Sequence, residues 1–226
     1  MIKRIYNRRR EEMKHLILNF VHLKDKTIQK HTLELMGKNR FPQLKENYSF
    51  YNKLLEGRKS IFSEVIEINK AGNNQNFLER QEVVKHPDLK EERMILNVDV
   101  KLNDHSYFQF KLRYKAFLPA PFFRFDSDGD THRNRIKGIP LEEQQITTPH
   151  FHKFNEKGIE IAYKTDKLLD PKEAKALEDI NLCLVHFFHE SNTRLKEDDF
   201  PEVKIMTDTL GYEMEAIDPN ENITFL

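Results

Sequence analysis

The stretch that decides the fold is Met94–Tyr114, with the sequence MILNVDVKLNDHSYFQFKLRY. Apolar and polar side chains alternate along its first half and again along its second half, and the polar run Asn103–Ser106 separates the two. Because successive side chains of a β-strand project to opposite faces, this period of two predicts two strands joined by a turn. The stretch is therefore interpreted as an antiparallel hairpin.

Shorter segments extend the sheet beyond this hairpin. Phe122–Asp126, His150–Phe154 and Ile159–Lys164 each have the composition of a short strand, and Asn155–Gly158 has the composition of a tight turn between the last two. Together with the hairpin they predict a meander. Val203–Thr207 and Ile223–Leu226 are expected to add edge strands, and Ile61–Ile68 suits a helix or the end of a strand equally well.

Helical periodicity is found at both ends of the chain. Apolar residues recur three and four apart over Met13–Val21, which predicts that residues 1 to about 60 are mainly helical. A second helix is expected from Pro171 to about Glu190, with Asp170 as its N-cap. Its apolar face, which should pack on one side of the sheet, consists of Leu177, Ile180, Leu184, Phe187 and Phe188.

These elements define an α+β fold, in which a helical N-terminal part is followed by an antiparallel meander packed against a C-terminal helix. The polar, glycine-bearing segment Ala71–Asn76 is the best internal boundary. It separates a mainly helical region, residues 1–75, from a sheet and helix domain, residues 76–226, that carries the candidate site. A single domain over the whole chain is the alternative.

Composition restricts the setting in which the protein works. Lys plus Arg and Asp plus Glu number 37 each among 226 residues, so no net field attracts a polyanion, although local patches still can. The one cysteine, Cys183, cannot form an internal disulfide, and neither a signal peptide nor a membrane span is recognisable. We expect a cytoplasmic protein without a membrane partner.

Candidate functional residues gather between Arg124 and Lys164. In a strand, residues two apart share a face, so Arg124 is expected beside Asp126, and His150 beside His152. If the two strands are neighbours, these four side chains share one surface. The polar segment that carries His132 and Arg133 lies between the two strands in sequence.

One interpretation of this set needs no metal or other cofactor. His132, His150 and His152 would transfer protons, and Arg124 and Arg133 would bind a phosphate group together with Tyr163 and Lys164. Such an arrangement is typical of a ribonuclease that uses the 2′-hydroxyl of RNA as its nucleophile. Enzymatic activity itself is left open.

The alternative interpretation is a divalent metal site. His150 and His152 with one carboxylate, either Asp126 or Glu156, form a ligand set found in many transition-metal sites. The run from His150 to Glu156 also resembles the first metal-binding motif of the cupin superfamily over seven residues, but the second motif of that superfamily is not found.

A wider resemblance rests on four segments in order, which are Phe123–Asp126, His132–Asn134, Thr148–His152 and Ala162–Tyr163. This order resembles a pattern of uncharacterised bacterial and phage proteins, over roughly residues 120 to 165. Short toxins of toxin–antitoxin pairs that resemble the TumE family carry a similar order. The resemblance implies a role in bacterial or phage conflict, as a toxin or a defence factor. It also implies nucleic acid or a nucleic-acid-handling protein as target, and an antitoxin or a target protein as partner. A non-enzymatic inhibitor or adaptor of counter-defence type is the alternative.

Overall fold

The computed structural model describes residues 41–71, 76–89, 93–136, 138–196 and 199–206. The expected helix over Met13–Val21 and the expected edge strand Ile223–Leu226 lie outside these residues. Among the described residues two compact units are distinguished: residues 41–50 with 154–161, and residues 51–153 with 162–206. Short helices α2 (Pro42–Glu46) and α3 (Tyr48–Glu56) precede the strands, so the described chain is mixed α+β.

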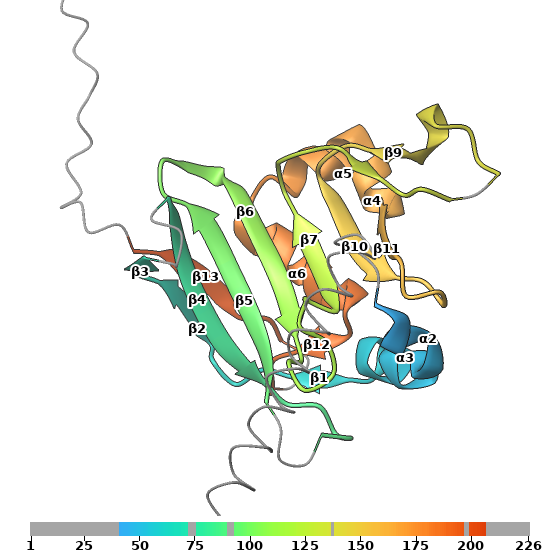
Figure 1. Ribbon diagram of the computed structural model, residues 1–226. Helices are drawn as coiled ribbons and strands as arrows, with labels where there is room; N and C mark the ends of the chain where they lie inside the picture. Colours follow the sequence, from blue (N-terminus) through green and yellow to red (C-terminus); the bar gives the residue numbers. More distant parts are fainter. Residues whose placement is uncertain (1–40, 72–75, 90–92, 137, 197–198, 207–226) are drawn as a thin grey trace, which may run out of the picture. The chain divides into compact units, whose positions relative to one another are not determined.

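A seven-stranded sheet in the order β11-β10-β7-β6-β5-β4-β3 is the main element (Figure 1). From β10 to β3 the neighbouring strands all run antiparallel. The bounds of the strands are β3 Lys70–Ala71, β4 Phe77–Val84, β5 Met94–Lys101, β6 Asp104–Arg113, β7 Phe123–Asp126, β10 His150–Phe154 and β11 Glu160–Tyr163.

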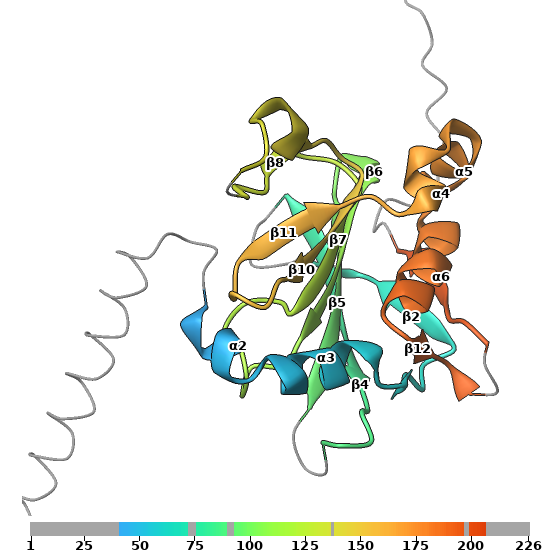
Figure 2. The ribbon, with the colours of Figure 1, turned by 90° about the vertical axis from the view of Figure 1, so that its right-hand side faces the viewer.

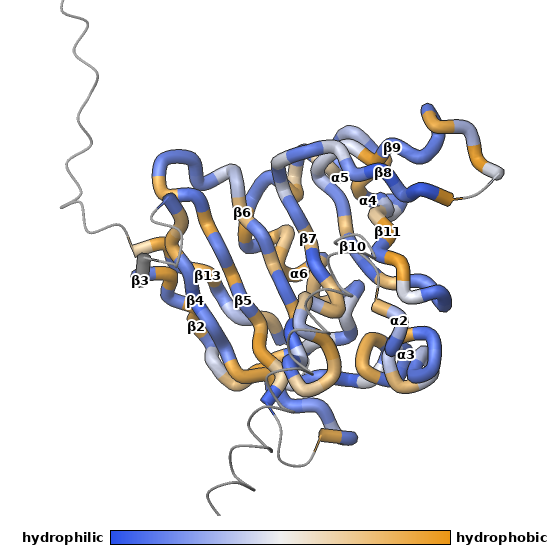
Figure 3. Tube along the Cα trace, viewed as in Figure 1, coloured by the Kyte–Doolittle hydropathy of each residue, from blue (hydrophilic) through white to orange (hydrophobic). Residues whose placement is uncertain are grey.

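The predicted hairpin is confirmed as β5 and β6, with Val98 opposite Phe110. Figure 3 shows the change of hydropathy from residue to residue along these strands. Strand β4 was not expected from the sequence, because its middle, Glu79–Glu82, is entirely polar and hides the period of two. It becomes a strand through its full-length pairing with β5, from Phe77 opposite Lys101 to Val84 opposite Met94.

Helix α6 (Ile180–Glu190) covers one face of this sheet, and β8 (His132–Arg133) lies on the other side (Figure 2). The ring of Phe187 is fully buried, with centroid distances of 5.4 Å to Phe110, 5.3 Å to Phe123 and 6.3 Å to Phe151. Cys183, one turn earlier on α6, is also fully buried. The core therefore lies between α6 and the apolar face of the sheet, as the sequence predicted.

The C-terminal helical region is broken rather than continuous. The prediction of one helix from Pro171 to Glu190 is wrong, since α5 (Pro171–Ala176) and α6 are separated by residues 177–179. The reason is a second N-cap: the carboxylate of Asp179 accepts hydrogen bonds from the backbone N–H of Asn181 and Leu182, which starts a new helix. Asp170 caps α5 as expected, and a further short helix, α4 (Asp166–Leu169), precedes it.

Three small two-stranded pairings complete the described structure. β1 (Lys59–Ser60) runs parallel to β12 (Thr193–Arg194), and β2 (Val65–Ile68) runs parallel to β13 (Glu202–Ile205). The ambiguous segment Ile61–Ile68 therefore ends in a strand. β8 pairs with β9 (Gln145–Ile146). No helix in the described part of the chain has both the length and the apolar character needed to cross a membrane.

The smaller unit is held together around the turn Asn155–Gly158. The Phe41 backbone N–H donates to the Gly158 carbonyl at 2.9 Å, and the ring of Phe41 meets that of Phe154 edge-on at 5.3 Å. Gly158 has a φ of +68°, and a Cβ on it would lie 2.2 Å from the Phe41 carbonyl oxygen. Only glycine fits this left-handed turn position against a neighbouring backbone.

Lys59 links the ends of two helices inside the larger unit. Its side chain is fully buried, and its Nζ donates to the carbonyl oxygens of Leu55 (2.8 Å), Gly57 (2.7 Å) and Ser191 (2.6 Å). These carbonyls lie at the C-terminal ends of α3 and α6, where no further helical N–H is available to them. Burial lowers the pKa of Lys59 to about 7, a cost that is offset because all three N–H bonds of the ammonium find acceptors.

Replacing this ammonium by an apolar side chain should destabilise the protein. Lys59→Met leaves three carbonyl oxygens, that of Ser191 buried, without their donor, and we expect the free energy of unfolding to fall by about 2–4 kcal/mol in urea titrations. Lys204→Met is the matched control, because Lys204 is exposed on β13 and should change stability by less than about 0.5 kcal/mol. Equal stability of the two variants would contradict this role for Lys59.

A buried imidazole on α6 gives the fold a pH dependence. His186 packs edge-on against Phe151, with ring centroids 5.4 Å apart, and its Nε2 lies 2.8 Å from the Thr165 hydroxyl. Burial, with smaller contributions from Lys167 and His189, lowers the pKa of His186 to about 4. Since the unfolded chain binds this proton near pH 6.5, acidification through this interval favours unfolding.

The free energy of unfolding should therefore fall as the pH decreases from about 6.5 to 4, and His186→Gln should make that decrease less steep. Glutamine can still accept a hydrogen bond from the Thr165 hydroxyl but does not titrate. Urea titrations at several pH values measure the effect, with His105→Gln on the exposed end of β6 as control. The assignment fails if both variants keep the slope of the parent protein.

Candidate functional site

Pairing of β7 with β10 brings the four predicted side chains onto one surface. His150 lies opposite Asp126, and His152 lies opposite Arg124. The alternate residues of the same strands, Phe123, Phe125 and Phe151, are buried on the α6 side. The apolar residues therefore fix which way the polar ones project, away from the helix.

The polar groups of this surface converge on one point. His152 Nε2 lies 2.7 Å from His150 Nε2, 3.0 Å from Asp126 Oδ2 and 3.0 Å from one terminal nitrogen of Arg124. His150 Nε2 lies 3.8 Å from the same carboxylate oxygen. Asp126, His150 and His152 are all buried, and one ligand atom from each can be chosen so that all lie within 4.8 Å of one another. We call these three residues the ligand triad.

The contacts of His152 Nε2 cannot all be hydrogen bonds at once. A ring nitrogen carries either one hydrogen or one lone pair. With a hydrogen, it can donate to Asp126 or to His150, but it then faces the N–H groups of Arg124. With a lone pair, it can accept from Arg124 or from a protonated His150, but it then faces the carboxylate. A cation placed among the triad would instead accept electron pairs from both rings and the carboxylate together.

Charge and burial in the triad favour the forms that bind cations. Burial by itself raises the pKa of Asp126, but the hydrogen bond from His152 and the charge of Arg124 outweigh it and lower that pKa below its usual range. Burial, followed by the neighbouring His152, lowers the pKa of His150 to about 4. At neutral pH the carboxylate is thus ionised and His150 is uncharged, which are the protonation states that metal ligands need. Oδ1 of Asp126 is also buried without a hydrogen-bond partner among the described residues.

His132 extends the cluster from a different segment. It lies on β8, and its ring meets those of His152 and His150 edge-on, at centroid distances of 4.9 Å and 6.3 Å. Unlike the two rings of the triad, it is partly exposed. The structure therefore brings His132, His150, His152 and Arg124 together.

Other predicted site residues lie elsewhere. Tyr163 stacks on Phe151 at 5.6 Å, on the α6 side of the sheet, and the Lys153 ammonium lies 4.5 Å from its ring centroid. Lys164 donates to the Thr148 carbonyl at 3.5 Å. Arg133 is exposed next to His132, and Glu156 is exposed in the turn of the smaller unit and does not belong to the triad.

Sequence reasoning missed a second polar group on the same sheet face. Asn97, Asp99 and Lys111 project from β5 and β6 into a hollow beside the triad. Their signal was present in the alternation of Met94–Tyr114, where every second residue is polar, but such a pattern usually indicates only a solvated face.

Comparison with known proteins adds no family assignment. No family model, no curated protein and no solved structure matches this chain.

Proposed function

We propose that this protein is a metal-dependent enzyme whose centre is the ligand triad Asp126, His150 and His152. The observation that carries the proposal is the position of His152 Nε2, which lies 2.7 Å from the imidazole nitrogen of His150 and 3.0 Å from a carboxylate oxygen of Asp126. Ligand nitrogens held at about 2.1 Å from one metal ion lie about 3 Å apart in neighbouring positions, so small shifts suffice to admit the ion.

The donor set favours a first-row transition metal over calcium or magnesium. Two imidazoles and one carboxylate suit zinc, iron, nickel or manganese, and they leave coordination positions open for substrate or water. Calcium and magnesium prefer shells made of oxygen atoms. A bound metal of this kind would supply Lewis acidity, or a water molecule that ionises near neutral pH.

The residues beside the triad have roles that suit hydrolysis. His132, partly exposed and next to both ligand rings, is placed to move a proton to or from a molecule bound on the open side. Arg124 keeps a permanent positive charge 3.2 Å from the Asp126 carboxylate and can stabilise an anionic group of the substrate. We infer a hydrolase that acts on an anionic substrate.

Metal binding is the first test of the triad. We expect metal-stripped protein to bind one equivalent of Co²⁺ or Zn²⁺, with Co²⁺ giving the visible absorption of a nitrogen- and oxygen-ligated site. Asp126→Ala, His150→Ala and His152→Ala should each weaken binding by at least about tenfold, because each removes one ligand. Competition with a chelator of known affinity measures the change.

Two control variants sharpen this experiment. Glu156→Ala removes the alternative acid named from the sequence, and His105→Ala removes an exposed imidazole at the end of β6. Both should bind metal as the parent protein does. The proposal that the triad binds a metal ion is contradicted if the parent protein binds no metal. It is also contradicted if the triad variants bind the metal as tightly as these controls.

The catalytic role of His132 is tested separately. His132→Ala should keep its metal but hydrolyse an activated phosphodiester, such as bis(p-nitrophenyl) phosphate, about 10²–10⁴-fold more slowly than the parent protein. His105→Ala again serves as control. Undiminished hydrolysis by His132→Ala would exclude proton transfer by this residue.

A metal-free ribonuclease is the second candidate, and the proximity of His132, His152 and Arg124 supports it. In that case the protein would cleave RNA in the presence of a chelator, and a His132→Ala, His150→Ala double variant would not. The toxin-like role, an antitoxin or target-protein partner and the non-enzymatic adaptor remain predictions from the sequence.

A further inference from the structure

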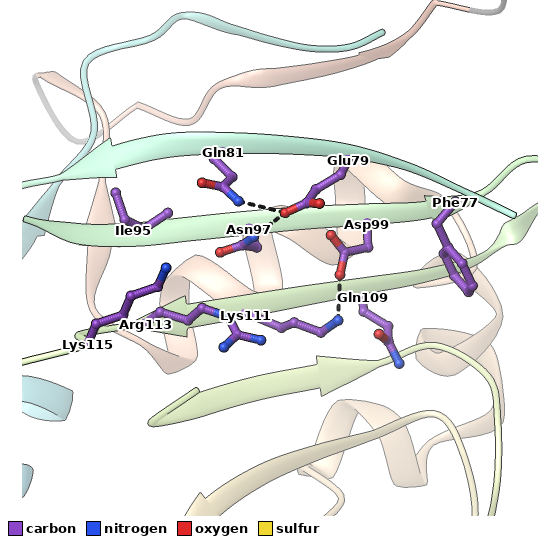
Figure 4. A pocket seen from close by; sticks show the side chains of 10 residues that line it. All are labelled: Phe77, Glu79, Gln81, Ile95, Asn97, Asp99, Gln109, Lys111, Arg113 and Lys115. Atoms are coloured by element: carbon purple, nitrogen blue, oxygen red, sulfur yellow. Dashed lines mark hydrogen bonds and ion pairs between the residues drawn. The ribbon is translucent and has the colours of Figure 1, made fainter. Parts of the chain in front are cut away.

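A polar hollow of about 430 Å³ lies on the sheet face that carries the triad. Side chains of β4, β5, β6 and the residues just after β6 line it (Figure 4). Its size falls in the range of pockets that hold small ligands. Along these strands, every second side chain is apolar and faces α6. The side chains between them line the hollow on the opposite face of the sheet.

The hollow is continuous with the triad through the strand register. Lys111, in the hollow, lies opposite Arg124, and Gln109 lies opposite Asp126. Side chains directly opposite each other on neighbouring antiparallel strands have Cβ atoms about 4.5–5.5 Å apart. A molecule in the hollow therefore borders on Arg124 and Asp126, and His150 and His152 lie one strand farther along the sheet.

Three cations and two acids line the hollow, so its net charge is one positive. Glu79 accepts hydrogen bonds from Asn97 and Gln81, each at 2.7 Å, and Asp99 is paired with Lys111 (Figure 4). Arg113 and Lys115 also line the hollow, and neither forms an ion pair with any residue that the structure describes. These two cations favour a ligand that carries an anionic group.

The floor of the hollow also contains buried oxygen atoms that lack a hydrogen-bond donor among the described residues. Asn97 is only 6% exposed, and its Oδ1 is buried without a hydrogen-bond partner among the described residues. Oδ1 of Asp99 is likewise buried and has no hydrogen-bond partner among the described residues. Buried acceptors are nearly always satisfied in folded proteins, so a ligand with N–H or O–H groups is expected above them. At the rim, Phe77 adds an aromatic ring.

We infer that the hollow binds a nucleotide unit, either a free nucleotide or one residue of a single-stranded RNA. The phosphate would lie against Arg113 and Lys115, and the ribose hydroxyls or the amino group of the base would donate to Asn97 and Asp99. Phe77 lies opposite Lys101, six residues along β5 from the partner of Arg113, so it would stack on the base of a following nucleotide of an RNA strand. This inference rests on the proposed function, because it makes the hollow the substrate pocket of the metal centre.

Binding to metal-stripped protein tests the pocket independently of the metal. Isothermal titration calorimetry would compare four probes, namely AMP, ribose 5-phosphate, inorganic phosphate and a single-stranded oligoribonucleotide. We expect AMP or the oligonucleotide to bind at least about tenfold more tightly than ribose 5-phosphate or phosphate, since only they contain the base. Preference for the oligonucleotide would identify RNA as the source, and equal binding would identify the free nucleotide.

Matched charge variants locate the binding. Arg113→Gln with Lys115→Gln should weaken binding at least about tenfold, whereas Lys172→Gln with Lys175→Gln, two exposed cations on α5, should not. The inference is overturned if neither nucleotide probe binds, if phosphate binds equally well, or if both double variants behave alike. The Arg113→Gln, Lys115→Gln variant should still bind Co²⁺ as the parent protein does, because neither residue belongs to the triad, so loss of this pocket and loss of the metal centre are told apart.

Discussion

Burial of Phe187 against the rings of Phe110, Phe123 and Phe151 is the constraint on which the rest of the larger unit depends. Burying a phenyl ring stabilises a fold by roughly 1.5–3 kcal/mol, and several rings from three strands share this contact. Because side chains alternate between the two faces of a strand, the residues on either side of these rings must project away from α6. Arg124, Asp126, His150 and His152 are thereby turned to the opposite face.

That opposite face therefore holds crowded polar groups at a cost to stability. Two buried imidazoles, a buried carboxylate and a guanidinium are crowded around one nitrogen, and in no single protonation state are all their contacts hydrogen bonds. Strained or unsatisfied buried groups of this kind are rare in proteins and cluster at active sites and ligand sites. The same reasoning applies to the acceptors of Asn97 and Asp99 in the neighbouring hollow.

Much of this arrangement could be predicted from local pattern, and the rest could not. The hairpin β5–β6 and the shared faces of His150 with His152 follow from alternation alone. The register that places His150 opposite Asp126, and the approach of His132, are set by tertiary pairing and carry no local signal. Strand β4 has too polar a middle for its period to show, and the break before α6 depends on the single cap Asp179.

Cys183, the one thiol in the chain, sits under this aromatic core on α6 and is fully buried. Burial also raises its pKa well above the ordinary value, so it is shielded from reagents both sterically and chemically. Its alkylation can proceed only from conformations in which α6 has lifted from the strands. The rate at which Cys183 is alkylated in the native protein therefore measures how often α6 detaches from the sheet, and the measurement needs no engineered probe.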